Sequence, residues 1–289
     1  MSGVTTKRIS VDGIELSAIY GEPASAAKAI IVALPGGGYT GSYWHHPLNQ
    51  HASLVILGAS LGFRTYAIDR PGYGFSAQTH PDGLSLDEQV TLIGTLVRQL
   101  SAASGAGVFL VGHSMGGILA LRVAADRPTG LLGLDVSGVP LRYSSRIANA
   151  VAAKLEGGGE SASRSAASLF YGPAGSFDPA LLREDPSLRP PPLLELSDSQ
   201  SWPDQFAATA CRVEVPVRYT LGEYETVTET GEGALRETAA LFSGSPRVEI
   251  ALQAGAGHNI SLHHTAGAFH LRVVAFLEEV LALRCASNI

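Results

Sequence analysis

The chain has 289 residues, of which 45% are hydrophobic and 16% charged, and its 20 basic against 26 acidic side chains give a net charge of −6. This composition excludes a disordered chain and a disulfide scaffold, and no uninterrupted apolar run reaches the roughly 18 residues that span a bilayer. The mild acidity argues against nucleic acid and anionic membrane as partners. We therefore expect a soluble globular protein.

Two features favour a cytoplasmic location. The N-terminal segment leads directly into an alternating pattern and lacks the apolar core of a signal peptide. Cys211 and Cys285 lie far apart in the sequence. We expect both to be buried free thiols in a reducing compartment.

The first half of the chain predicts a hairpin followed by alternating strands and helices. Residues 7–20 flank the turn dipeptide Asp12-Gly13 with alternating apolar residues, which is typical of a β-hairpin. Apolar runs predict strands at 29–34, 63–68, 108–112 and 131–136. Helical spacing and the capping box of Ser85 and Glu88 predict helices at 49–61, 85–100 and 115–125.

The alternation resumes near the end of the chain. Strands are predicted at 217–221 and 248–252, and helices at 235–242 and 266–283. The hairpin and the six apolar runs together give eight strands. Because parallel neighbours need crossover connections, we expect an α/β fold with a mainly parallel sheet flanked by helices.

Residues 140–212 interrupt this alternation. They contain a Gly/Ser/Ala-rich stretch at 156–168 and the run Pro190-Pro191-Pro192, but no strand signal. A structureless loop of that length is uncommon inside a compact domain. We therefore predict an inserted cap over 140–212, with short helices at 148–155 and 179–183, and a core domain formed by 1–139 and 213–289.

One serine lies in a setting typical of a nucleophile. The run Gly112-His113-Ser114-Met115-Gly116-Gly117 follows a predicted buried strand and opens a predicted helix. The flanking glycines permit the strained turn that exposes Ser114, and the helix N-terminus, with the Met115 N–H, points positive potential at an anion formed there. This context predicts a nucleophilic serine.

With three further motifs in order, this elbow resembles the α/β-hydrolase family. The resemblance covers most of the chain and implies a Ser-acid-His triad in that order. It implies that His258, just past the last strand, is the general base for Ser114. The three further motifs are Pro35-Gly36-Gly37-Gly38, Asp69-Arg70-Pro71-Gly72-Tyr73-Gly74-Phe75-Ser76 and Gly255-Ala256-Gly257-His258.

The resemblance also implies an acid after the strand at 217–221. The family usually places an Asp at the third position past Gly222, where this chain has Glu225. Glu can orient an imidazole as Asp does, although its extra methylene requires a shifted backbone or another rotamer. Glu223 nearby and Asp135, at the end of an earlier strand, are the alternatives.

The glycine run after Pro35 resembles the family's oxyanion loop, which normally begins with His-Gly. Pro35 replaces that His, a departure that affects the loop's internal hydrogen bond more than its donors. The resemblance implies that Gly37 or Gly38 supplies a backbone N–H beside that of Met115. It gives Asp69 the structural role of bracing the loop that follows it.

Other candidate residues carry weaker signals. The histidine pairs 45–46 and 263–264 have no carboxylate or cysteine at ligand spacing, so we expect no metal, and the serine chemistry needs no cofactor. Four aromatic residues could line an acyl pocket, with ordinary packing equally able to explain them. They are Tyr39, Tyr43, Trp44 and Trp202.

The resemblance implies a serine hydrolase that cleaves a carboxylic ester or thioester through an acyl-enzyme on Ser114. Its partner would be a small-molecule acyl substrate, free or carrier-bound. Carbon–carbon bond hydrolysis, lactone opening and acyl transfer are alternatives within the fold, and the Gly36-Gly37-Gly38 run resembles the loops of carbon–carbon hydrolases. A ligand receptor without catalysis is the alternative from another class. The oligomeric state stays open.

Overall fold

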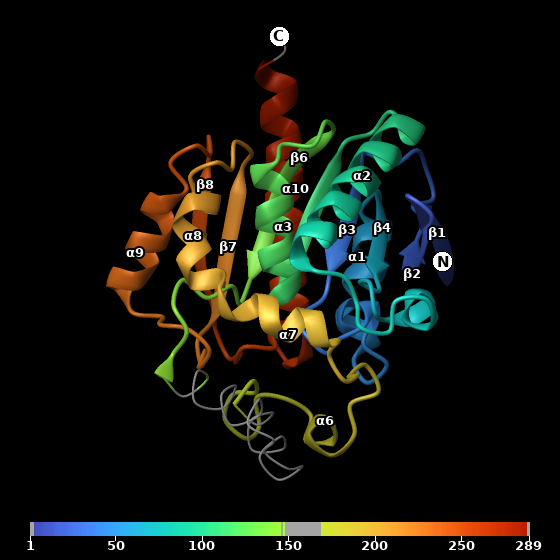
Figure 1. The fold of residues 1–289 in the computed structure, drawn as a ribbon. Helices are drawn as coiled ribbons and strands as arrows, with labels where there is room; N and C mark the ends of the chain where they lie inside the picture. Colours follow the sequence, from blue (N-terminus) through green and yellow to red (C-terminus); the bar gives the residue numbers. More distant parts are fainter. Residues whose placement is uncertain (1–2, 146, 148–168, 288–289) are drawn as a thin grey trace.

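The computed structural model describes residues 3–145, 147 and 169–287, and its centre is an eight-stranded sheet (Figure 1). The strand order is β1-β2-β4-β3-β5-β6-β7-β8. The strands are β1 (Val4–Val11), β2 (Ile14–Gly21), β3 (Ala29–Leu34), β4 (Phe63–Ile68), β5 (Val108–His113), β6 (Leu131–Ser137), β7 (Val217–Gly222) and β8 (Val248–Gln253).

The described ranges also contain helices, most of which flank this sheet. They are α1 (Leu54–Ser60), α2 (Leu86–Ser104), α3 (Met115–Ala125), α6 (Ala180–Arg183), α7 (Leu193–Gln200), α8 (Trp202–Ala210), α9 (Glu232–Leu241) and α10 (Ala266–Ser287). Only β1 with β2 and β2 with β4 pair antiparallel, and the other neighbours are parallel. The predicted α/β fold with a mainly parallel sheet is thereby confirmed.

The opening hairpin turns as its sequence predicts. Val11 pairs with Ile14 across the turn. Asp12 and Gly13 both have positive φ, 47° and 83°, as a type I′ turn requires. This turn has the twist that suits two antiparallel strands.

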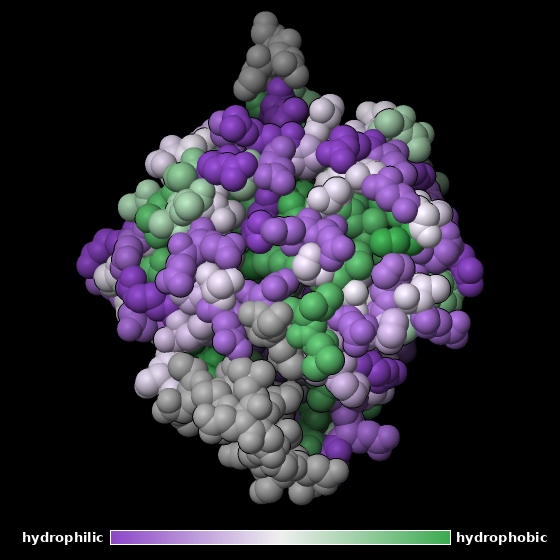
Figure 2. Space-filling model, in the orientation of Figure 1, coloured by the Kyte–Doolittle hydropathy of each residue, from purple (hydrophilic) through white to green (hydrophobic). Residues whose placement is uncertain are grey.

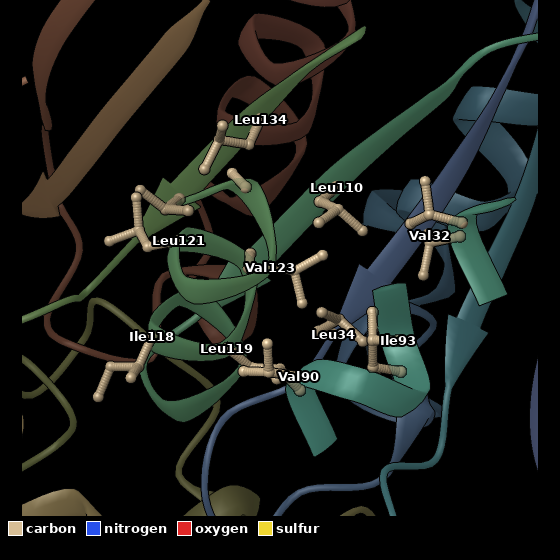
Figure 3. Packing of buried hydrophobic residues seen from close by; sticks show 14 of the residues in the cluster. Val32, Leu34, Val90, Ile93, Leu110, Ile118, Leu119, Leu121, Val123 and Leu134 are labelled. Carbon is tan, nitrogen blue, oxygen red and sulfur yellow. The ribbon is translucent and has the colours of Figure 1, made fainter. Parts of the chain in front are cut away.

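The core has two layers, one on each face of the sheet, because successive strand residues point to opposite faces. In β3, Ile30, Val32 and Leu34 join a cluster with residues of α2, α3 and α8. Figure 3 shows Val32 and Leu34 beside residues of α2 and α3 in this cluster. The residues between them, among them Ile31, join a second cluster with residues of α1 and α10. The apolar run at 29–34 is thus a strand buried on both faces.

Two details differ from the sequence predictions. The helix predicted over 49–61 is split into a 3-10 turn, Gln50–Ala52, and α1, because Ser53 is an N-cap whose Oγ accepts a hydrogen bond from the Ile56 N–H. The prediction of two buried thiols was wrong. Cys211 and Cys285 are both exposed, the first directly after α8 and the second in the last turns of α10, outside either core layer.

The described part of the insertion contains α6, α7 and α8. The short helix expected at 179–183 is confirmed as α6, whereas the helix predicted at 148–155 and the stretch 156–168 lie outside the described residues. Figure 1 shows α6 and α7 beyond the carboxyl ends of the strands, at the opposite end from the C-terminus of α10. In this part of the chain, α8 packs against α3 of the core.

Helix α7 has one buried side and one exposed side. Figure 2 shows apolar side chains at the surface over this helix, where Leu193 is 71% exposed. Glu195, two residues later, is only 3% exposed. Helix α7, which lies within the predicted cap, therefore directs a carboxylate into the molecule. No helix within the described ranges is long and apolar enough to cross a membrane.

Candidate active site

Ser114 lies at the turn between β5 and α3 with the backbone angles of a strained elbow, φ 50° and ψ −117°. The turn is tight, since a Cβ added to Gly116 would lie 2.1 Å from the Leu34 carbonyl oxygen. The Ser114 N–H donates to the Ser137 carbonyl at 2.8 Å. Packing against β3 and β6 thus holds the serine at the carboxyl edge of the sheet, and its side chain stays partly exposed.

His258 follows β8 at the same edge, and its ring is 2% exposed. Its Nδ1 lies 2.9 and 3.0 Å from the two carboxylate oxygens of Glu225. An ionised carboxylate can only accept, so in the neutral ring it is Nδ1 that carries the proton and Nε2 that has the lone pair. The ring of His113, 4.8 Å away between centroids, stays neutral because burial holds its pKa well below the usual value.

Glu225 is fixed by its own turn. Its Oε1 accepts hydrogen bonds from the Thr226 and Val227 N–H groups at 2.9 and 2.8 Å, and its side chain is fully buried. These two donors and the His258 ring satisfy the carboxylate without a buried cation. Because the turn brings these two N–H groups to the carboxylate, it accommodates the extra methylene of Glu.

The other two carboxylates have different partners. Asp135 lies 2.8 Å from the Arg218 guanidinium, and both side chains are buried in the sheet. Glu223 accepts a hydrogen bond from the Gly255 N–H at 2.8 Å. Of the three candidate acids, the structure brings Glu225 to His258.

The glycine loop after β3 lies against the elbow. A Cβ added to Gly36 would be 3.3 Å from the Cβ of Ser114. The Gly38 N–H is already engaged, because it donates to the Tyr73 hydroxyl at 2.9 Å. The Met115 N–H, at the start of α3, has no intrahelical partner. A role of Gly37 and Met115 as oxyanion donors stays a prediction, which this geometry favours over a role of Gly38.

Residues 31–270 match the family model described as the alpha/beta hydrolase family. This range includes the elbow, the glycine loop after β3 and His258. The chain belongs to this family. Its sheet order and its elbow agree with that membership, and the predicted resemblance is confirmed.

This α/β hydrolase is similar to proteins named for several hydrolytic activities. It is 33% identical over 156 residues to a Klebsiella pneumoniae protein named for carbamate hydrolysis, a match that covers 53% of this chain and 54% of that protein. It is 31% identical over 127 residues to an esterase of Mycobacterium tuberculosis, covering 44% of this chain and 38% of the esterase. The chain thus spans about half the length of these relatives, or less.

The similarity to a solved structure covers almost the whole chain of this α/β hydrolase. A crystal structure of a thermostable carboxyl esterase from Bacillus coagulans superposes with a TM-score of 0.69 at 18% identity. That match covers 97% of this chain and all of the esterase chain. At this identity the likeness concerns the fold alone.

Arg70 supports the glycine loop after β3 from inside the molecule. Its Nε and one Nη donate to the carbonyls of Pro35 and Gly36 at 3.0 and 2.9 Å, and the other Nη donates to Glu195 at 2.8 Å. The sequence analysis quoted Arg70 within a motif without giving it a role. It missed Glu195, which lies in a segment with no recognisable pattern.

His263 holds the loop that carries His258. Its Nε2 accepts hydrogen bonds from the Gly257 and Gly172 N–H groups at 2.9 and 3.3 Å, and its Nδ1 donates to the Asn259 carbonyl at 2.9 Å. Burial lowers the pKa of His263 to about 4, so the ring is neutral and can accept. The sequence analysis had weighed this histidine only as a metal ligand. No group of three metal-ligating side chains occurs among the described residues.

Three of the predicted pocket aromatics form a layer beside the elbow. The Tyr39 hydroxyl contacts that of Tyr171 at 2.9 Å. Tyr43 stacks on the ring of His113 at 4.8 Å, and Trp44 meets Tyr43 edge-on. All three are at most 5% exposed, and a role in an acyl pocket stays a prediction.

Trp202 has the contacts of a packing residue. Its indole N–H donates to the Pro140 carbonyl at 2.9 Å, and its ring packs edge-on against Phe206 within the core layer of α3 and α8.

Asp69 accepts hydrogen bonds from the Ser17 hydroxyl and the Gly41 N–H, at 2.5 and 2.7 Å. The Ser17 hydroxyl also accepts a hydrogen bond from the Phe75 N–H. Asp69 therefore braces the loop after β4 through Ser17.

Proposed function

We propose that the protein is a serine hydrolase that cleaves a carboxylic ester or thioester of a small-molecule acyl substrate. The observation that carries the proposal is the contact of 2.9 Å between His258 Nδ1 and the buried Glu225 carboxylate. Glu225 and His258 lie in the loops that follow β7 and β8, at the same edge of the sheet as the strained Ser114 elbow. This edge is where ligands of open α/β sheets bind.

In the proposed reaction, Ser114 Oγ attacks the acyl carbon while His258 Nε2 takes the hydroxyl proton. Glu225 stabilises the imidazolium that results. The N–H groups of Met115 and Gly37 bind the oxyanion of the tetrahedral intermediate. His258 then returns the proton to the departing alkoxide or thiolate, and the acyl-enzyme remains.

Water completes the cycle. His258 takes a proton from the attacking water, whose oxygen bonds to the acyl carbon, and the Ser114 oxygen leaves with that proton. The products are an acid and an alcohol or thiol. Every step uses side chains and backbone of this chain, so the proposed mechanism needs no cofactor.

The first test is the mass of the intact protein after exposure to a fluorophosphonate probe. Wild type should gain the mass of one adduct, whereas Ser114→Ala should gain none and keep its unfolding midpoint. Equal labelling of both proteins would overturn the assignment of Ser114. A folded wild type that does not react would favour a ligand receptor instead.

The bond class requires a second experiment. Rates of hydrolysis are compared for esters, thioesters, carbamates, lactones and a vinylogous diketone of varied acyl size. We expect kcat/KM to be highest for an ester or thioester. A higher value for the diketone would instead assign carbon–carbon bond hydrolysis, and transfer of the acyl group to an added alcohol would assign acyl transfer.

A further inference from the structure

The oxyanion loop is held by a buried charged network that reaches into the cap. The side chains of Arg70 and Glu195 are 1% and 3% exposed. The Tyr73 hydroxyl lies 3.2 Å from both carboxylate oxygens of Glu195, to which it can donate, while it accepts the Gly38 N–H. A Cβ added to Gly37 would lie 2.8 Å from Glu195 Oε1. The carboxylate therefore packs directly on the loop.

The Arg70 guanidinium determines where the loop's N–H groups point. In a trans peptide the C=O and N–H bonds point in opposite directions. Arg70 binds the Gly36 carbonyl, which shares a peptide unit with the Gly37 N–H, so that N–H points away from the guanidinium. Arg70 binds the Pro35 carbonyl in the same way, which fixes the preceding peptide unit. A cation on a peptide oxygen also polarises the unit and strengthens its N–H as a donor.

Fold stability alone does not account for such a pair. A buried ion pair gains little net free energy, because desolvation of both ions offsets their attraction. The network occurs where Pro35 stands in place of the family's His, and it joins a loop of the core to a helix of the insertion. The effect of this network is therefore on the geometry of the oxyanion loop.

We propose that Arg70 is a positioning residue that aims the Gly37 N–H at the oxyanion, and that Glu195 of α7 holds Arg70 in this position. The proposal rests on the proposed serine hydrolase function. It makes the oxyanion hole depend on the docking of α7, so that the cap takes part in catalysis beyond covering the substrate.

The test compares two double variants that each replace a buried Arg–carboxylate pair by apolar side chains. Arg70→Met/Glu195→Leu removes the network, and Arg218→Met/Asp135→Leu removes a pair of equal distance and burial that lies away from the loop. Such replacements often preserve stability. We measure kcat and KM on an ester that wild type cleaves, the rate constant of fluorophosphonate labelling, and the unfolding midpoint.

The first variant should lose about 10- to 100-fold in kcat and in labelling rate, since misplaced oxyanion donors weaken binding of the transition state. Its KM should change less than about 3-fold, and the second variant should keep both rates. If the first double variant does not fold, Glu195→Gln against Asp135→Asn carries the same comparison. Wild-type kcat in the folded Arg70/Glu195 variant, or equal losses in both variants, would overturn the proposal.

The proposal and the proposed function fail in different ways. If Ser114 is not the nucleophile, Ser114→Ala retains the activity of wild type, and the positioning role of Arg70 is overturned together with the proposed function. If Ser114→Ala is inactive while Arg70→Met/Glu195→Leu is fully active, the serine hydrolase stands and the positioning role is wrong.

Discussion

At the residue scale, the acid beside His258 is selected by its hydrogen bonds. The fully buried Glu225 carboxylate accepts hydrogen bonds from two backbone N–H groups and contacts the imidazole of His258. Asp135 is equally buried, but its Oδ2 lies 2.8 Å from the Arg218 guanidinium, and desolvation raises its pKa to about 6. The two carboxylates are thus alike in burial and differ in their partners.

Replacing Glu225 should therefore affect catalysis far more than replacing either alternative acid. Glu225→Gln should lower kcat by about 10⁴, because an amide cannot hold the imidazole tautomer that leaves Nε2 free. Asp135→Asn and Glu223→Gln should change kcat less than about 3-fold. Steady-state kinetics of the three variants decide the matter, and a large loss in Asp135→Asn alone would assign the acid to β6.

At the element scale, the approach of α3 to β3 sets the position of Ser114. The first turn of α3 meets the end of β3 so closely that no side chain fits between Gly116 and the Leu34 carbonyl. The elbow, the oxyanion loop and the helix N-terminus therefore share one backbone contact. A small displacement of α3 would move Ser114 relative to the donors of the loop.

A methyl group at this contact should disturb both stability and reactivity. Gly116→Ala should lower the free energy of unfolding by about 2 kcal/mol or more, because overpacking forces the backbone apart, and should abolish fluorophosphonate labelling. The control is Gly233→Ala in α9, where nothing lies within 4 Å of an added Cβ. That variant should label normally and gain about 0.5–1 kcal/mol. Normal labelling of Gly116→Ala would show that the elbow tolerates a shift.

At the scale of the whole molecule, buried neutral histidines make the fold sensitive to acid. Burial lowers the pKa of His263 and of His270 to about 4 and holds that of His113 well below its usual value. These rings lie in the His258 loop, in α10 and in the elbow. The unfolded chain binds protons at these sites near pH 6.5, so it takes up more protons than the folded chain between about pH 6.5 and 4.

The free energy of unfolding should consequently fall as pH drops through this range, by up to about 3 kcal/mol for His270 alone, while its contribution is complete above pH 6.5. Urea unfolding at pH 7.5, 6 and 5 measures the slope. His270→Gln should make it shallower, even if the variant is less stable at every pH. His51→Gln, at an exposed histidine, should leave the slope unchanged. An unaltered slope in His270→Gln would show that this ring does not resist protonation.

Much of this architecture was already determined by the sequence. The alternating strands and helices, the hairpin at Asp12-Gly13 and the elbow at Ser114 depend on patterns within a few residues: apolar period, turn chemistry, and glycine at a strained turn. These preferences are local and act before the chain closes on itself. The α/β fold and its family could therefore be predicted.

Only the tertiary structure decided which distant side chains meet. The resemblance implied Glu225, and the packed structure brings it rather than Glu223 to His258. It also engages the Gly38 N–H with Tyr73 and joins Glu195 to Arg70 from 125 residues away. No local pattern encodes these pairings, because they depend on where crossovers and the cap place the ends of separate elements. For the same reason the sequence did not show that Cys211, directly after α8, and Cys285, in α10, are exposed. Their exposure depends on how these helices pack.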